Sequence, residues 1–273
     1  MLEQMLSRYV QDTEQQKQHA LREVMQEIAL AGLYRSDFFE QAAFYGGTCL
    51  RIFYGLPRYS EDLDFSLLHP QVDFSLAPYF SAIESEFLAL GIPVTIVHKR
   101  KTAKTAIESA FLKNDTKLVE LSFQQVNVKI KFEVDTCPPL CFKTEEKLLI
   151  EPFSFYVKCF SLPDLYAGKM HALLFRQWKN RVKGRDWFDF EWYVRHGSKL
   201  NLAHFNERAI QSGDIKEAID QIGFMDLLYK RIESVNISNA RLDAERFIDD
   251  TRALDIWSTD YFQQLSGRIR FID

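Results

Sequence analysis

The sequence has little cysteine and no arrangement of it that indicates a metal site. The closest of its four cysteines, Cys137 and Cys141, enclose two prolines, which is typical of a turn, and no Cys-x-x-Cys pair occurs. A zinc site needs further ligands clustered nearby, and none follows. We therefore expect Cys49, Cys137, Cys141 and Cys159 to be reduced thiols, as in a cytoplasmic protein.

Long apolar runs and an excess of positive charge are also absent. No apolar run reaches the roughly 20 residues that span a bilayer, and the polar N-terminal stretch lacks the apolar segment of a signal peptide. The net charge of −4 excludes a protein that is basic overall, so any nucleic-acid binding needs local basic patches. The 273 residues, 47% of them hydrophobic, suit one large globular domain or two modest ones without membrane contact.

The most distinctive stretch runs from residue 45 to 67 and ends in an Asp-x-Asp pair. Leu63-Asp64-Phe65-Ser66-Leu67 alternates apolar and polar residues, which predicts a half-buried strand. On a strand, Asp62 and Asp64 point to the same face, roughly 6–7 Å apart at the backbone. Two such carboxylates repel unless a cation lies between them, and Mg²⁺ prefers their oxygens.

A Gly-Gly-Thr sequence precedes this strand. Gly46 and Gly47 allow close approach of the backbone to a ligand, and Thr48 can donate from its N–H and its hydroxyl. Residues 48–54 are expected to form a helix, whose start favours an anion. We therefore expect these three residues to hold phosphates.

The ordered set of motifs resembles the AbiEii/AbiGii toxin family. The matching residues are Gly46-Gly47-Thr48, Leu50-Arg51, Tyr54-Gly55, Arg58, Ser60 and Asp62-Leu63-Asp64-Phe65. The resemblance implies an α+β fold, with a polymerase β-like nucleotidyltransferase core of mixed sheet and flanking helices followed by a helical C-terminal domain. It also implies that Arg58 and Ser60 contact the nucleotide. The alternative is an ordinary strand with solvated aspartates.

A third carboxylate is expected from a neighbouring strand. Between residues 126 and 134 every even position is apolar, which predicts a strand with one buried face. By the resemblance, Glu133 or Asp135 completes the catalytic and metal-binding set with Asp62 and Asp64. A polar face with Lys–Glu pairing is the open alternative.

A second constellation lies about a hundred residues later. Ser161, with Pro163 and Asp164 behind it, predicts a helix start, and we place a domain boundary near residue 160, dividing 1–160 from 161–273. The helix is expected to reach Lys179, with Lys169 and Arg176 on one face. The motif that continues this pattern is Lys183-Gly184-Arg185-Asp186-x-x-Asp189.

This order of residues also resembles the AbiEii pattern. The resemblance implies that Lys169, with Arg176 and Arg185, neutralises the triphosphate. It implies that Asp186 serves as a further metal ligand or base. The basic clusters at residues 99–104 and 176–185 suit an RNA, the triphosphate alone, or a solvated face.

The remaining elements follow from periodicity and capping. We expect helices over 1–32, 36–42, 75–90, 200–212, 215–221, 224–235 and 259–265, and strands over 94–97, 105–112, 117–124 and 153–159, with 144–150 helical or extended.

The function expected from these observations is Mg²⁺-dependent transfer of a nucleotide from a nucleoside triphosphate to a hydroxyl. The resemblance implies an RNA acceptor such as the 3′ end of tRNA, a cognate antitoxin protein and a role in phage defence. Two alternatives stay open. One is nucleotidylation of a protein hydroxyl, and the other is a non-catalytic nucleotide-binding interaction module.

Overall fold

The structure is a computed structural model of the chain and divides into two compact units. It describes residues 1–98, 116–123, 128–176 and 182–272. Unit 1 comprises residues 1–54, 60–138 and 144–159, and unit 2 comprises residues 55–59, 139–143 and 160–273. The division expected near residue 160 stays a prediction, as does the strand expected over 105–112, which lies outside the described residues.

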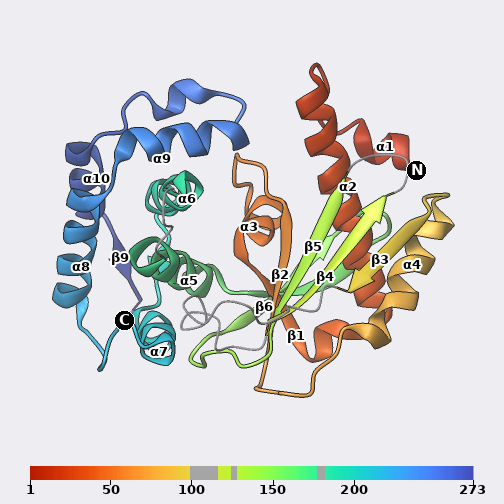
Figure 1. The fold of residues 1–273 in the computed structure, drawn as a ribbon, viewed down its shortest axis with the longest axis horizontal. Coiled ribbons are helices and arrows are strands. Elements are labelled where there is room, and N and C mark those ends of the chain that lie inside the picture. The colour runs from red at the N-terminus through yellow and green to blue at the C-terminus, as the bar shows by residue number, and fades with distance from the viewer. Residues whose placement is uncertain (99–115, 124–127, 177–181, 273) are drawn as a thin grey trace. The chain divides into compact units, whose positions relative to one another are not determined.

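Unit 1 is built on a mixed seven-stranded sheet (Figure 1) in the order β3-β4-β5-β2-β1-β7-β6. Its strands are β1 (Ala42–Tyr45), β2 (Asp62–Leu67), β3 (Val94–His98), β4 (Thr116–Phe123), β5 (Lys129–Asp135), β6 (Thr144–Leu149) and β7 (Phe155–Phe160). β2 is central: it pairs antiparallel with β1 and parallel with β5. The expected α+β class is confirmed.

The helices of unit 1 are α1 (Leu2–Leu6), α2 (Glu14–Arg35), α3 (Gly46–Tyr54) and α4 (Phe80–Ala89), with short 3-10 turns η1 (Phe38–Glu40) and η2 (Ala77–Tyr79). α2 begins at a capping box in which Thr13 accepts from the Gln16 N–H and the Gln16 side chain accepts from Thr13. α2 and α4 pack against each other on one side of the sheet (Figure 1).

Aromatic side chains form the core beneath β2. Phe65 faces away from the aspartates and lies in contact with Phe38, Phe44 and Phe132 at ring-centroid distances of 5.0, 5.2 and 6.3 Å. All four rings are at most 2% exposed. This packing anchors one face of the strand, so its other face can carry polar residues at fixed positions.

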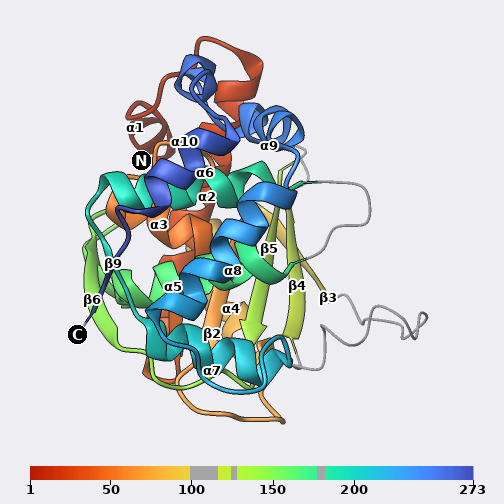
Figure 2. The ribbon, with the colours of Figure 1, turned by 90° about the vertical axis from the view of Figure 1, so that its left-hand side faces the viewer.

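Unit 2 is mostly helical, with one small parallel pair of strands (Figure 2). Its elements are α5 (Leu162–Phe175), α6 (Gly184–Arg195), β8 (Lys199–Leu200), α7 (Leu202–Ser212), α8 (Gln221–Ser234), α9 (Ile237–Ala244), η3 (Glu245–Phe247), η4 (Thr251–Leu254), α10 (Thr259–Ser266) and β9 (Arg270–Phe271). α5 and α6 pack together through Tyr166 and Tyr193, whose rings stack with centroids 4.2 Å apart. No helix within the described ranges is both long and apolar enough to cross a membrane.

Several boundaries differ from those expected. Residues 1–32 form two helices, because a capped break at Thr13 interrupts them. The segment 36–42, expected to be a helix, instead contains the C-cap residue of α2, the turn η1 and the first residue of β1. Residues 215–220 form no helix, since α8 begins at Gln221, and 144–149 form a strand. α5 ends at Phe175, so Arg176 lies beyond it, with an extended ψ of 120°. The expectation that Arg176 shares a helix face with Lys169 is therefore wrong.

Candidate active site

The Gly-Gly-Thr sequence lies where β1 ends and α3 begins. Gly46 has a φ of +84°, which L-residues with a side chain rarely adopt. A Cβ at this position would stand 2.5 Å from Oδ2 of Asp64. The expected helix after the glycines is confirmed, and it begins earlier, at Gly46. Only glycine fits here, because both the backbone conformation and the Asp64 carboxylate exclude a side chain.

β2 places Asp62 and Asp64 on one face of the sheet, as the alternation predicts. Leu63 and Phe65 point the other way and are fully buried, whereas both aspartates are partly exposed. Across the parallel pairing with β5, Asp62 lies opposite Lys131 and Asp64 lies opposite Glu133. Three carboxylates and one ammonium therefore emerge from adjacent positions on one sheet surface.

The two candidates for the third carboxylate have different surroundings. Glu133 is half-buried and forms an ion pair with Lys131 on its own strand. Asp135 is 9% exposed and accepts from the Cys137 N–H at 3.1 Å, so it caps the turn after β5. The geometry favours Glu133, because it is the register partner of Asp64. Within the described ranges, no group of three or more His, Cys, Asp or Glu side chains is arranged to hold a metal ion.

Thr48 and Ser60 secure the backbone that leads into β2. The fully buried Thr48 hydroxyl donates to the Asp62 carbonyl. Because this hydroxyl is engaged within the fold, a phosphate contact from Thr48 would come from its main-chain N–H. The Ser60 carbonyl accepts from the side chain of Gln26. Gln26 was not expected at the site, and its only signal in the sequence is an amide among the apolar residues of α2.

A second charged cluster lies inside unit 2. Lys169 on α5 donates to Oδ1 of Asp186 and lies 2.8 Å from Oδ2 of Asp189, both on α6. The Arg58 guanidinium makes a two-pronged contact with Asp189, with N–O distances of 2.5 and 2.6 Å. Both aspartates are at most 3% exposed. Asp186 and Asp189, three residues apart, therefore lie on the same face of α6.

Nearby cations determine the ionisation of this cluster. Burial alone would raise the pKa of Asp186, but Lys169, Lys183 and Arg176 outweigh it and lower that pKa well below its usual range. The pKa of Asp189 is lowered in the same way by Arg58 and Lys169 against the effect of burial. Burial also lowers the pKa of Lys183 to about 8. Both carboxylates are therefore ionised and compensated at neutral pH.

The other predicted nucleotide contacts of unit 2 have separate surroundings. Arg58 is 3% exposed and engaged with Asp189 and the Tyr59 carbonyl, so in this structure it holds α6 rather than presenting its charge at the surface. The Arg185 guanidinium stacks over the Phe247 ring at 3.9 Å. Arg176 is exposed. The basic cluster at 99–104 and residues 177–181 of the second cluster lie outside the described residues.

Gly184 fixes the start of α6. A Cβ on it would lie 1.7 Å from the Ala240 carbonyl, so α6 and α9 approach closely only because this residue is glycine. Its N–H donates to the buried Asp243 carboxylate at 2.8 Å. This contact caps the helix and places Asp186 in its first turn.

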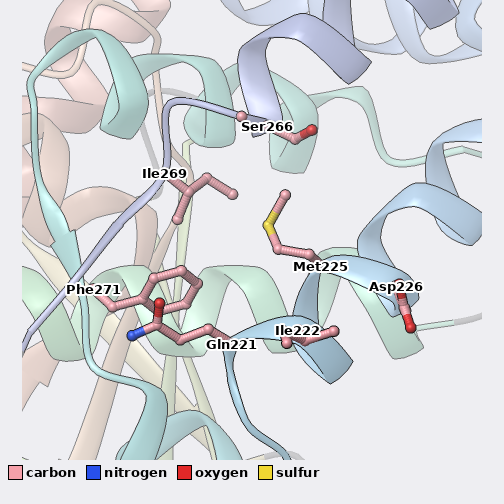
Figure 3. Close-up of a pocket in the computed structure, with 8 residues that line it drawn as sticks. Gln221, Ile222, Met225, Asp226, Ser266, Ile269 and Phe271 are labelled. Atoms are coloured by element: carbon pink, nitrogen blue, oxygen red, sulfur yellow. The ribbon is translucent and has the colours of Figure 1, made fainter.

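A pocket of about 350 Å³ lies elsewhere in unit 2, between α8 and the C-terminal residues (Figure 3). Its lining is Gln221, Ile222, Met225, Asp226, Ser266, Gly267, Ile269 and Phe271. None of the residues predicted for catalysis or nucleotide binding lines it.

The family model for the nucleotidyl transferase AbiEii toxin of type IV toxin–antitoxin systems matches residues 28–271. The chain belongs to the AbiEii family. The match covers both units, including the Asp-x-Asp strand and the Lys169 cluster. The protein is therefore a nucleotidyltransferase of a toxin family, as the sequence motifs predict.

Solved structures, two of them described as nucleotidyltransferases, share the fold. MenT4, the nucleotidyltransferase toxin Rv2826c from Mycobacterium tuberculosis H37Rv, superposes with a TM-score of 0.62 at 13% identity, over 99% of this chain and 90% of that one. A putative nucleotidyltransferase from Helicobacter pylori gives a TM-score of 0.51 at 19% identity, over 93% and 92% of the chains. JHP933 from Helicobacter pylori gives 0.51 at 19% identity, over 92% and 89%. No curated protein matches the sequence at a significant level.

Proposed function

We propose that this AbiEii-family protein transfers a nucleotidyl group from a nucleoside triphosphate to a hydroxyl of an RNA, with the 3′ end of a tRNA as acceptor. The observation that carries the proposal is the pair of partly exposed aspartates on one face of β2, beside the glycine that opens α3. Phe65 anchors the other face of the strand, so the two aspartates are held rigidly. Phosphoryl transfer depends on such fixed positions of the groups that bind the metal ion and the phosphates.

The reaction needs alignment and charge neutralisation more than covalent help. The acceptor oxygen forms a bond to the α-phosphorus, the bond from that phosphorus to the bridging oxygen breaks, and pyrophosphate leaves. The acceptor proton passes to a carboxylate, for which Glu133, Asp135 and Asp186 are the candidates. Gly47 and the N–H of Thr48 hold the phosphates at the start of α3.

The residues present fit a magnesium ion. Asp62 and Asp64 offer hard oxygen ligands on one face, and Mg²⁺ binds through one or two carboxylates while keeping positions for phosphate. Bound there, the ion would neutralise phosphate charge and lower the pKa of the attacking hydroxyl. Glu133, opposite Asp64, is the neighbour best placed to extend this set.

The roles of the unit 2 residues are proposed on the resemblance and on their charge. Lys169 neutralises the triphosphate and the departing pyrophosphate, assisted by Arg176 and Arg185. Arg58 and Asp189 position Lys169 and α6 from within the unit. The biological setting that we propose is a toxin held in check by an antitoxin protein, which the family match supports, and used in phage defence, which rests on the resemblance of the motifs alone.

A labelling assay tests the proposal. Purified protein is incubated with Mg²⁺, total tRNA and each α-labelled nucleoside triphosphate, beside an Asp62→Asn/Asp64→Asn control. Label in the tRNA band, absent from the control, is the expected result. Label on protein instead would support nucleotidylation of a protein hydroxyl. No label with any nucleotide, tRNA or added protein would contradict the proposed transfer.

A further inference from the structure

Side chains from two helices contact the main chain that leads into Asp62. The β1–β2 register extends to Tyr45, opposite Asp64, and α3 follows directly at Gly46. On the other side of β2, Asp62 pairs with Lys131 of β5.

Two side chains from two helices donate to three consecutive carbonyls at this position. Nε2 of Gln26, on α2, donates to the carbonyls of Ser60 at 3.3 Å and Glu61 at 3.1 Å. The Thr48 hydroxyl, on α3, donates to the carbonyl of Asp62. The carbonyls of Ser60, Glu61 and Asp62 thus accept from two buried side chains, as buried main-chain carbonyls require.

Gln26 itself cannot move freely. Its side chain is 1% exposed, in a helix whose neighbouring residues Val24 and Ile28 are fully buried. One turn earlier, Glu23 accepts from Nε of Arg51 on α3 at 2.9 Å. The polar stripe of α2 therefore connects the strand entrance and α3 to one rigid helix.

We propose that Gln26 is a positioning residue for the nucleotidyl transfer, acting through the backbone of Ser60 and Glu61 on the carboxylate of Asp62. The inference rests on the proposed function, since it presumes that Asp62 is a metal ligand. The inference gives α2 a role in the reaction, although none of the sequence motifs lies on this helix. Loss of the Gln26 amide loosens the backbone before Asp62, and a carboxylate displaced by a fraction of an ångström binds a hard ion less well.

The test compares the wild-type protein with Gln26→Met, which keeps the length of the side chain and removes the amide that donates to Ser60 and Glu61. Binding of Mn²⁺, as a spectroscopic substitute for Mg²⁺, is measured by electron paramagnetic resonance of the free ion, and turnover is measured against Mg²⁺ concentration. We expect Mn²⁺ affinity to fall about 10-fold and the Mg²⁺ concentration for half-maximal turnover to rise correspondingly. Gln26→Asn stays polar but is too short to reach the carbonyls, so we expect the same loss of Mn²⁺ affinity. It replaces Gln26→Met if Gln26→Met does not fold.

Ile28→Val is the matched control, because it removes a buried methylene from the same helix and no hydrogen-bond donor. A purely structural effect lowers the folded fraction and leaves metal affinity unchanged, as the control should show. Wild-type Mn²⁺ affinity and Mg²⁺ dependence in a folded Gln26 variant would overturn the inference, whatever its thermal stability.

The two levels of failure are separable. If Asp62→Asn abolishes Mn²⁺ binding and turnover while the folded Gln26 variants match the wild type, the inference fails and the proposed function stands. If the wild type shows neither transfer nor Mn²⁺ binding that depends on Asp62, the proposed function fails and this inference with it.

Discussion

The two aspartate pairs of this protein have the same chemistry and opposite surroundings. Asp62 and Asp64 stand two residues apart on a strand and are partly exposed. Asp186 and Asp189 stand three apart on a helix, are buried, and are compensated by Lys169 and Arg58. A buried, compensated pair contributes to the fold, whereas a partly exposed pair on an anchored strand is available to a cation that arrives with the substrate.

Among the substitutions that test this difference between the two pairs, we expect a change of Asp64 to have the largest effect on activity. Asp64→Asn keeps the shape of the side chain and removes its charge, so we expect turnover to fall by about 10³-fold or more, as when a group that stabilises transition-state charge is removed. The free energy of unfolding should stay the same or rise slightly, because two like charges no longer repel. Transfer rates and urea unfolding of the same preparation measure both. Activity retained within 10-fold would show that Asp64 holds no essential metal.

The corresponding change in unit 2 should act on stability. Arg58→Met removes the two-pronged partner of Asp189 and leaves a buried charge compensated by Lys169 alone. We expect the free energy of unfolding to fall by about 3 kcal/mol, as for other buried pairs that lose one member. Arg252→Met is the matched control, since its pair with Asp250 lies on the surface. An Arg58 variant as stable as the control would show that the buried cluster does not support the fold.

Sequence patterns predicted the parts of the site that depend on local periodicity. The alternation around Asp64 and from residue 126 to 134 gave the strand faces, because one side of each strand must be buried. The pairing of Glu133 with Asp64 and of Arg58 with Asp189 joins residues that are 69 and 131 positions apart. No local pattern contains such distances, so the role of Arg58 in holding α6 could not be predicted.

Capping residues predicted one helix boundary correctly and another wrongly. Ser161 precedes α5 as expected. Ser36, expected to start a helix, ends one: its hydroxyl donates to the carbonyls of Gly32 and Leu33. A serine hydroxyl can serve either end of a helix, and only the tertiary fold decides between them. Periodicity does not predict β1, because Ala42, Ala43 and Phe44 are all buried and the strand shows no alternation.

Smaller effects on stability are expected when glycines with positive φ are changed to alanine. Two such changes separate the cost of the backbone conformation from the cost of a collision with Asp64. Gly46→Ala should cost about 1–2 kcal/mol for the positive φ alone, and more for the collision with the Asp64 carboxylate. Gly91→Ala is the control, since Gly91 has a φ of +73° and a Cβ there meets nothing within 4 Å. We expect both variants to lose stability in urea unfolding, but only Gly46→Ala to lose nucleotidyl transfer. Equal transfer activity of the two variants would mean that nucleotidyl transfer does not depend on the exact position of the Asp64 carboxylate.

The smallest effect concerns pH and a buried histidine of unit 2. Burial lowers the pKa of His204 to about 4, its Nδ1–H donates to the Leu140 carbonyl, and its ring lies edge-on to Phe142 and Phe160. A histidine whose pKa is lower in the folded than in the unfolded state binds fewer protons when folded. Its contribution to stability is complete above pH 6.5 and declines as the pH falls toward 4, by about 1 kcal/mol per pH unit.

His204→Asn keeps a donor near the position of Nδ1 and cannot take up a proton. Its free energy of unfolding should therefore decline less steeply between pH 6.5 and 4 than that of the wild type, in urea unfolding at several pH values. The ionised aspartates of the Lys169 cluster do not confound this window, because their lowered pKa values place their protonation at lower pH in the folded state. They protonate near pH 4 only in the unfolded chain, equally in both proteins. Parallel pH profiles for the two proteins would show that His204 does not titrate differently on folding, and that the acid sensitivity of unit 2 arises elsewhere.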